Sequence, residues 1–67
     1  MNVQVLMDEQ LETMIDQHGL RYVLFTLGVI CELKGQHIVS EWHDKTTAQA
    51  WRSQSQKLIT FADTVKL

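Results

Sequence analysis

The sequence contains no proline, only three glycines and a single cysteine. A turn-rich β fold needs many residues that interrupt regular structure, so their scarcity favours helices joined by short connections. One cysteine excludes an intrachain disulfide framework and fits a reducing cytosol. We find no basic start followed by an apolar stretch and a small-residue cleavage site, so we expect no secretory signal and a cytoplasmic location.

The sequence also lacks a surplus of cations, because six Lys and Arg residues stand against eight Asp and Glu residues. Four carboxylates precede the first lysine or arginine, at Asp8, Glu9, Glu12 and Asp16. Cations dominate the last third, at Lys45, Arg52, Lys57 and Lys66. This asymmetry suits an acidic first helix lying beside a basic last helix, within one chain or between two chains. The sequence has no concentration of Lys and Arg residues that would form a basic surface for nucleic acid.

The longest apolar stretch spans residues 20–33, in which only Arg21, Thr26 and Glu32 are clearly polar. A helix that is apolar nearly all round must be covered on nearly all sides. The stretch is shorter than the ~20 apolar residues of a bilayer-spanning helix, so we expect no membrane span. A chain of 67 residues supplies about two more helices, and two helices cannot surround a third. We therefore predict self-association, with a homodimer as the expected state.

Residues 1–7 alternate apolar and polar side chains and predict a short extended arm ahead of a single helical domain over residues 8–67. Asp8 is the predicted N-cap of a first helix that ends near His18, and Gly19 marks the turn after it. Apolar spacing predicts one long helix over residues 20–42, with a kink or an early end near Gly35 as the alternative.

A third helix is predicted to begin after Asp44, whose carboxylate can cap it. Ala48, Ser55 and Ala62 place small residues seven positions apart, which allows close packing against a neighbouring helix. The predicted fold is therefore all-α: a helical hairpin plus a third helix, assembled with other copies into a helical bundle.

Four apolar residues lie on the outward face of the long helix and are the predicted self-association surface: Tyr22, Phe25, Val29 and Leu33. Trp51 is added to this set because it can fill a large socket between helices. The same four residues argue against a helix-turn-helix over residues 11–30, since a DNA-reading helix needs polar side chains on that face. Lys45 and Arg52 on the third helix are a possible phosphate contact, although two cations release few counterions.

Metal binding and catalysis find little support in the sequence. Cys31, His37 and His43, with His18 as a fourth ligand, resemble a zinc set by residue type alone. On a continuous helix, steps of six residues turn about 600°, so these side chains leave on different sides. No serine has an obvious base and no glycine-rich phosphate loop is present. We predict no metal site, no cofactor and no enzymatic activity.

A scattered set of residues resembles a group of small, mostly helical, uncharacterised proteins of bacteria and their phages. The set comprises Ile15, Asp16, His18, Gly19, Leu20, Val23, Leu24, Ile30, Cys31, Lys34, His37, Ile38, Trp42, Asp44, Ala48 and Trp51. Similar sequences tend to carry alanine in place of Gly35 and glutamine in place of His43. The resemblance implies a compact helical domain and carries no activity.

The sequence as a whole predicts a non-catalytic interaction protein, accessory or inhibitory, that acts as a homo-oligomer and binds another protein. The alternative is a small nucleic-acid-binding regulator that uses the basic side of the third helix, through Lys45 and Arg52.

Overall fold

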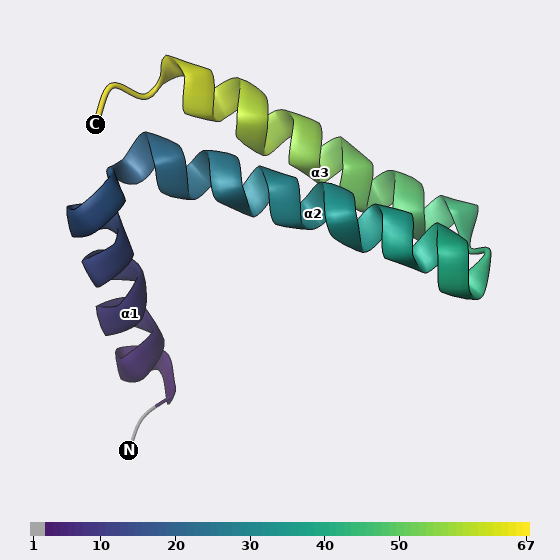
Figure 1. Ribbon diagram of the computed structural model, residues 1–67, viewed down its shortest axis with the longest axis horizontal. Helices are drawn as coiled ribbons and strands as arrows, with labels where there is room; N and C mark the ends of the chain where they lie inside the picture. Colours follow the sequence, from purple (N-terminus) through teal and green to yellow (C-terminus); the bar gives the residue numbers. More distant parts are fainter. Residues whose placement is uncertain (1–2) are drawn as a thin grey trace.

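The computed structural model describes residues 3–67, which form three helices and no strand: α1 (Val3–His18), α2 (Leu20–Trp42) and α3 (Lys45–Thr64). The all-α prediction of three helices is confirmed. Helices α2 and α3 run antiparallel as a long hairpin, and α1 leaves the start of α2 at a steep angle, so the chain has the shape of an L (Figure 1).

The extended arm predicted over residues 1–7 is wrong for residues 3–7, which are the first turns of α1. Asp8 therefore lies inside α1, where it accepts a hydrogen bond of 2.8 Å from the side chain of Gln4, and it is not an N-cap. Two alternating valines are too weak a strand signal against the helix-forming residues between and after them. Residues 1–2 of the predicted arm lie outside the described residues.

The predicted turn at Gly19 is confirmed. The Gly19 amide donates to the Ile15 carbonyl at 2.7 Å and closes α1, and a φ of +89° then redirects the chain into α2. Glycine suits this position because side-chain-bearing residues rarely adopt positive φ. The C-terminal Leu67 returns to the same corner, where its carbonyl accepts from the Arg21 amide at 3.0 Å.

Helix α2 is continuous from Leu20 to Trp42, so the alternative of an early end near Gly35 is wrong. Gly35 is buried against α3, and a Cβ at this position would lie 3.1 Å from the Ala48 carbonyl oxygen. Packing against α3 therefore offsets the low helix propensity of this glycine.

Small residues line the contact between α2 and α3. On α3, Ala48, Ser55 and Ala62 are only 1%, 3% and 1% exposed, as their seven-residue spacing predicted. Ser55 lies against Gly28 of α2 and Ala48 against Gly35, and these two glycines are also seven residues apart. Ala62 lies nearer the start of α2, beside Arg21 and Phe25. The Ser55 hydroxyl donates to the Gly28 carbonyl at 2.6 Å, which joins the two helices at the middle of the hairpin.

Asp44 caps α3, as predicted. Its carboxylate accepts from the Thr47 amide at 3.0 Å and from the Thr47 hydroxyl at 2.7 Å. These two hydrogen bonds lower the pKa of the Asp44 carboxyl below its ordinary value, because both stabilise the ionised form. His43 before it has a positive φ of 54°, and its amide donates to the Val39 carbonyl at 3.1 Å to close α2.

The overall shape leaves little interior. The Cα atoms span 37 × 34 × 13 Å, and their radius of gyration is 14.0 Å. A compact domain of this length has a radius of gyration of about 11 Å. Among the described residues, the only buried apolar side chains are Val23, Ala48 and Ala62. Helices α2 and α3 therefore form a single layer from which α1 projects, and the described residues enclose no core.

We expect Gly28→Ala to destabilise the hairpin. A Cβ at Gly28 would lie 2.6 Å from Ile59 Cγ1 and 3.1 Å from the Ser55 carbonyl oxygen. Overpacking costs about 1–3 kcal/mol, against a gain of about 1 kcal/mol in helix propensity. Denaturant unfolding at fixed protein concentration should show a lower free energy of unfolding. Ser40→Ala, at an exposed site of the same helix, is the control, and an equal gain in both variants would contradict the close approach.

We expect the stability lost in Asp44→Ala to depend on pH. Because the folded-state pKa of Asp44 is lowered, its contribution is complete above the ordinary carboxyl pKa and disappears as pH falls through the folded value. The variant should unfold at lower guanidinium concentration than the wild type at neutral pH, and the gap should close as the pH falls below the ordinary carboxyl pKa and through the lowered folded value. Asp44→Asn keeps an acceptor and should retain most of the neutral-pH stability. A gap that is independent of pH would argue against the cap.

Candidate interaction surfaces

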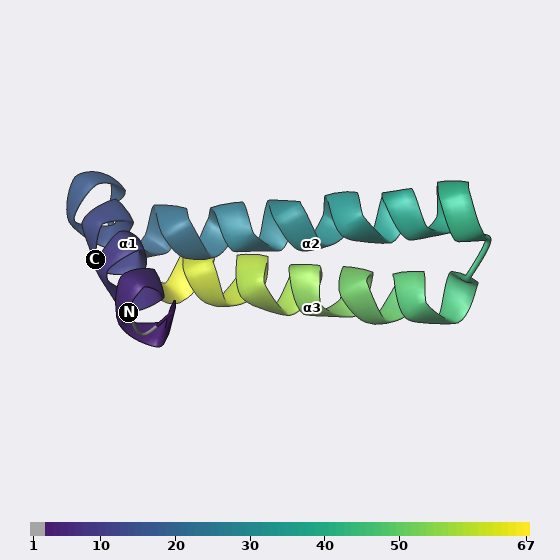
Figure 2. The same cartoon turned by 90° about the horizontal axis from the view of Figure 1, so that it is seen from below.

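The hairpin has two broad faces because α2 and α3 lie side by side in one layer (Figure 2). The small residues occupy the contact between the helices, so larger side chains are displaced to either side of it. On α3, Trp51 and Arg52 flank this contact in opposite directions, since successive residues of a helix are about 100° apart. Each face is described below by the residues that line it.

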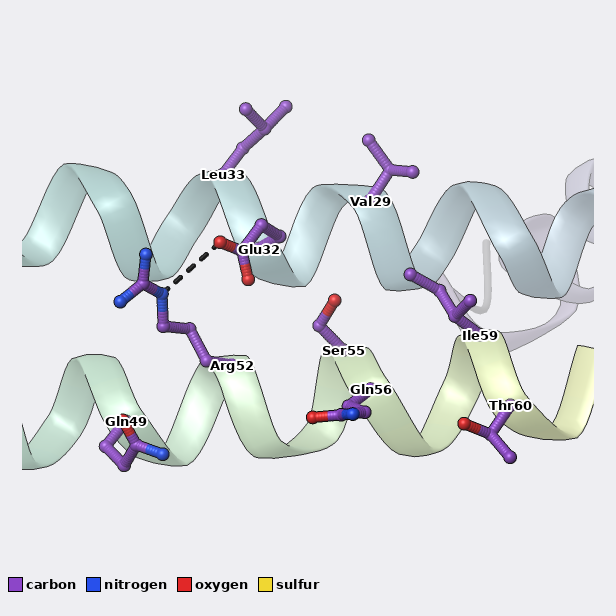
Figure 3. Close-up of a pocket in the computed structure, with 9 residues that line it drawn as sticks. All are labelled: Val29, Glu32, Leu33, Gln49, Arg52, Ser55, Gln56, Ile59 and Thr60. Carbon is purple, nitrogen blue, oxygen red and sulfur yellow. Dashed lines mark hydrogen bonds and ion pairs between the residues drawn. The ribbon is translucent and has the colours of Figure 1, made fainter.

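The first face, called the Val29 face, carries the predicted self-association residues of α2. They are Tyr22, Phe25, Val29 and Leu33, with exposures of 59%, 45%, 37% and 57%. Beside them, α3 contributes mostly polar residues to a shallow pocket, namely Gln49, Arg52, Ser55, Gln56, Ile59 and Thr60 (Figure 3). This face therefore combines an apolar stripe on α2 with an amide- and hydroxyl-bearing stripe on α3.

Two ion pairs cross from α2 to α3 on the Val29 face. Glu32 pairs with Arg52 at 3.3 Å, and Arg21 pairs with Asp63 at 3.5 Å. Both pairs are exposed to solvent, so each contributes little to stability. The pairing nevertheless partly neutralises Arg52, one of the two cations that were predicted as a possible phosphate contact. The other, Lys45, begins α3 and lies beyond the apolar stripe.

The opposite face, called the Trp51 face, is more apolar. It includes a hollow lined by Ile30, Leu33, Lys34, His37, Ile38 and Trp51. The Lys34 ammonium lies 5.5 Å from the centroid of the Trp51 ring, a cation–π contact. Trp51 is only half-buried and borders an open hollow, so within one protomer it does not fill a socket between helices as predicted.

Helix α1 stands on the Trp51 face at one end of the hairpin, behind the two helices in Figure 3. It has no buried residue of its own. Leu11 and Ile15 are half-buried, whereas Val3, Met7 and Met14 are 77%, 50% and 46% exposed. Within the described residues, α1 makes contacts with α2 and none with α3.

The accessible surface of the chain, 5442 Å², is large for its mass of 7.8 kDa. A folded monomer of this mass exposes about 4,400 Å². The excess of about 1,000 Å² exceeds the ~800 Å² that each partner buries in a standard protein–protein interface. The excess accessible surface, polar and apolar together, is therefore of the size that a second protein chain would bury.

The predicted site residues fall on both sides of the hairpin. Tyr22, Phe25, Val29 and Leu33 share the Val29 face, but Trp51 lies on the opposite face. The sequence prediction missed the exposed apolar residues of α1 and of the Trp51 face, namely Met7, Met14, Leu27, Ile30 and Phe61. The apolar spacing of α2 could have signalled Leu27 and Ile30, because that helix is apolar all round.

No metal site is formed by the described part of the chain, where no three His, Cys, Asp or Glu residues gather closely enough to hold an ion. Cys31 is a half-buried free thiol. His18 lies at the end of α1, with its ring 5.6 Å from that of Tyr22. These residues contribute no cluster of titratable groups that would define a catalytic centre among residues 3–67.

Helix α2 is long and apolar enough to cross a membrane, judged by length and composition alone. The core helix of a soluble protein and a signal sequence meet the same criterion. Helix α3 packs along α2 and would have to enter the membrane with it. It carries Arg52, Lys57 and several glutamines, and such side chains are costly in hydrocarbon.

Comparison of the chain with protein-family models, curated proteins and solved structures finds no match.

Proposed function

We propose that this protein is a non-catalytic interaction module that works as a homo-oligomer and binds another protein through the helical surface left free. The observation that carries the proposal is the uncovered state of α2. Its apolar side chains point to all sides, and α3 covers only the side that bears Gly28 and Gly35. A folded chain gains free energy by removing such surface from water, and a second copy is the partner always present.

The apolar residues on both hairpin faces support this proposal. Phe25 and Leu33 on α2 and Phe61 on α3 are each at least 45% exposed in the protomer. Burial of one such side chain is worth about 1.5–3 kcal/mol, so a few of them suffice for a stable dimer. With only Val23, Ala48 and Ala62 buried among the described residues, the protomer lacks an apolar core that would stabilise it alone.

The face that does not join the copies is available to a protein partner. A mixed apolar and polar surface is typical of interfaces that form and dissociate, whereas permanent interfaces are more apolar. The Val29 face, with its glutamines and exposed ion pairs, has the first character. An accessory or inhibitory role for the complex follows as a proposal, because the described helices offer a binding surface of this mixed character.

The test of self-association is the solution mass from light scattering over a dilution series. We expect a dimer or larger species that persists at low concentration. Leu33 lines the hollows on both faces and is 57% exposed, so Leu33→Lys should weaken assembly whichever face is used, without unfolding the hairpin. Loss of its burial should raise the dissociation constant by about tenfold or more.

Ser40→Lys is the control, because it adds the same charge to α2 at an exposed polar site. It should leave the mass profile unchanged, and circular dichroism should show equal helix content in both variants. A wild-type chain that stays monomeric at all concentrations would overturn the proposal.

A further inference from the structure

We propose that the second copy is held by exchange of α1, which lies across the Trp51 face of its partner while the partner's α1 does the same in return. This inference rests on the proposed self-association and specifies where the copies meet. It also assigns the binding of a foreign protein to the Val29 face, which the exchange leaves open, and so replaces the sequence prediction that Tyr22, Phe25, Val29 and Leu33 join the copies.

The first argument is that α1 has no stabilising environment within its own chain. It is 16 residues long, and isolated helices of about that length are marginal in water. Only its last turns reach α2, where Leu11 and Ile15 are half-buried. The same side of the helix continues outward through Met7 and Val3, four and eight residues before Leu11, and both are exposed. A surface beyond the chain's own hairpin must cover them.

The second argument is the shape of the protomer. Helix α1 and the hairpin meet as the two arms of an L (Figure 1). Helix α1 lies behind the hairpin when the Val29 face is viewed (Figure 3), so the opposite face, which bears Trp51, forms the inner wall of the longer arm. Near the corner Val23 is buried, whereas Ile30 is 44% exposed further along, and Trp51 and Ile38 border an open hollow near the far end. Two such L shapes related by a two-fold axis interlock, so that each α1 covers the far end of the other hairpin.

The third argument is charge complementarity. Helix α1 carries Asp8, Glu9, Glu12 and Asp16 and no lysine or arginine, while α3 carries Lys45, Arg52 and Lys57 and the single carboxylate Asp63. These opposite charges do not meet within the protomer, because α1 does not contact α3 in the described residues. Arg52 is paired with Glu32 on the Val29 face, and Lys45, seven residues earlier, lies on the same side of α3. The cations open to an α1 exchanged onto the Trp51 face are therefore Lys57 of α3 and Lys34 of α2, which borders the hollow there. Ion pairs with these lysines fix the register of an interface more than they strengthen it.

The experiment that tests the exchange is zero-length coupling of carboxylates to lysine amines by a carbodiimide, on the full chain. Unlabelled and ¹⁵N-labelled protein are unfolded together, refolded and coupled, and the linked peptides are read by mass spectrometry. We expect links from the α1 carboxylates to Lys57 or Lys34 in which one peptide is labelled and the other is not. Lys66 is left out of the count because it lies near Gly19, at the end of its own α1.

A pair of matched variants provides an independent readout. Met7 and Val5 are each 50% exposed, and the helical turn places them about 160° apart on α1. Met7→Glu puts a charge on the apolar side of α1 that also bears Leu11. It should raise the dimer dissociation constant by about tenfold or more. Val5→Glu puts the same charge on the acidic side and should change it by about threefold or less.

The outcomes separate this inference from the proposed function. Mixed-label links together with a selective effect of Met7→Glu support the exchange. A second outcome is a dimer in which no link from α1 joins a labelled peptide to an unlabelled one, and in which Met7→Glu and Val5→Glu change the dissociation constant equally. This result would overturn the exchange and leave self-association standing. A chain that is monomeric throughout the dilution series would overturn both.

Discussion

The close approach of α2 and α3 is the contact on which the rest of the structure depends. Because Gly28 has no side chain, the Ser55 hydroxyl reaches its carbonyl oxygen at 2.6 Å, and Ala48 and Ala62 extend the contact to either end. Helices this close leave no room for large side chains between them. Every large apolar residue of the hairpin is therefore displaced to one of the two faces.

This displacement explains why a chain with 45% hydrophobic residues buries so few of them. In a thicker bundle, a third helix would lie in the groove between the other two and enclose their side chains. Here α1 leaves the layer after the Gly19 turn and touches only the start of α2. The resulting protomer is 13 Å thin, with an apolar inner corner and two apolar faces. Assembly with other chains is the remaining way to remove this surface from water.

The two faces differ in chemistry, and we propose a different use for each. On the Val29 face the α3 side is polar, and the Glu32–Arg52 pair crosses it. On the Trp51 face both helices contribute apolar groups, and α1 adds its own. A permanent contact between copies needs the second kind of surface, whereas a contact with a separate partner tolerates the first. This division is the basis for placing the exchange of α1 on the Trp51 face.

Local signals in the sequence predicted much of the fold. The bounds of α2, the Asp44 cap, the Gly19 turn and the seven-residue spacing of Ala48, Ser55 and Ala62 all depend on interactions between residues close in sequence or on one helical period. The start of α1 was predicted wrongly, because two alternating valines resemble a strand when the helix that contains them is not yet known. The four apolar residues of the Val29 face were also found from periodicity.

The sequence by itself determined that the chain is helical, where the helices turn, and that α2 is too apolar to stay exposed, since these depend on local backbone preferences and composition. Only the tertiary structure decided which side of α2 is covered by α3. That choice places Trp51 and Val29 on opposite faces of the hairpin. It also decided that α1 stands away from α3. The physical reason is that helical periodicity orders residues around one axis but leaves the rotation and direction of neighbouring helices to long-range packing.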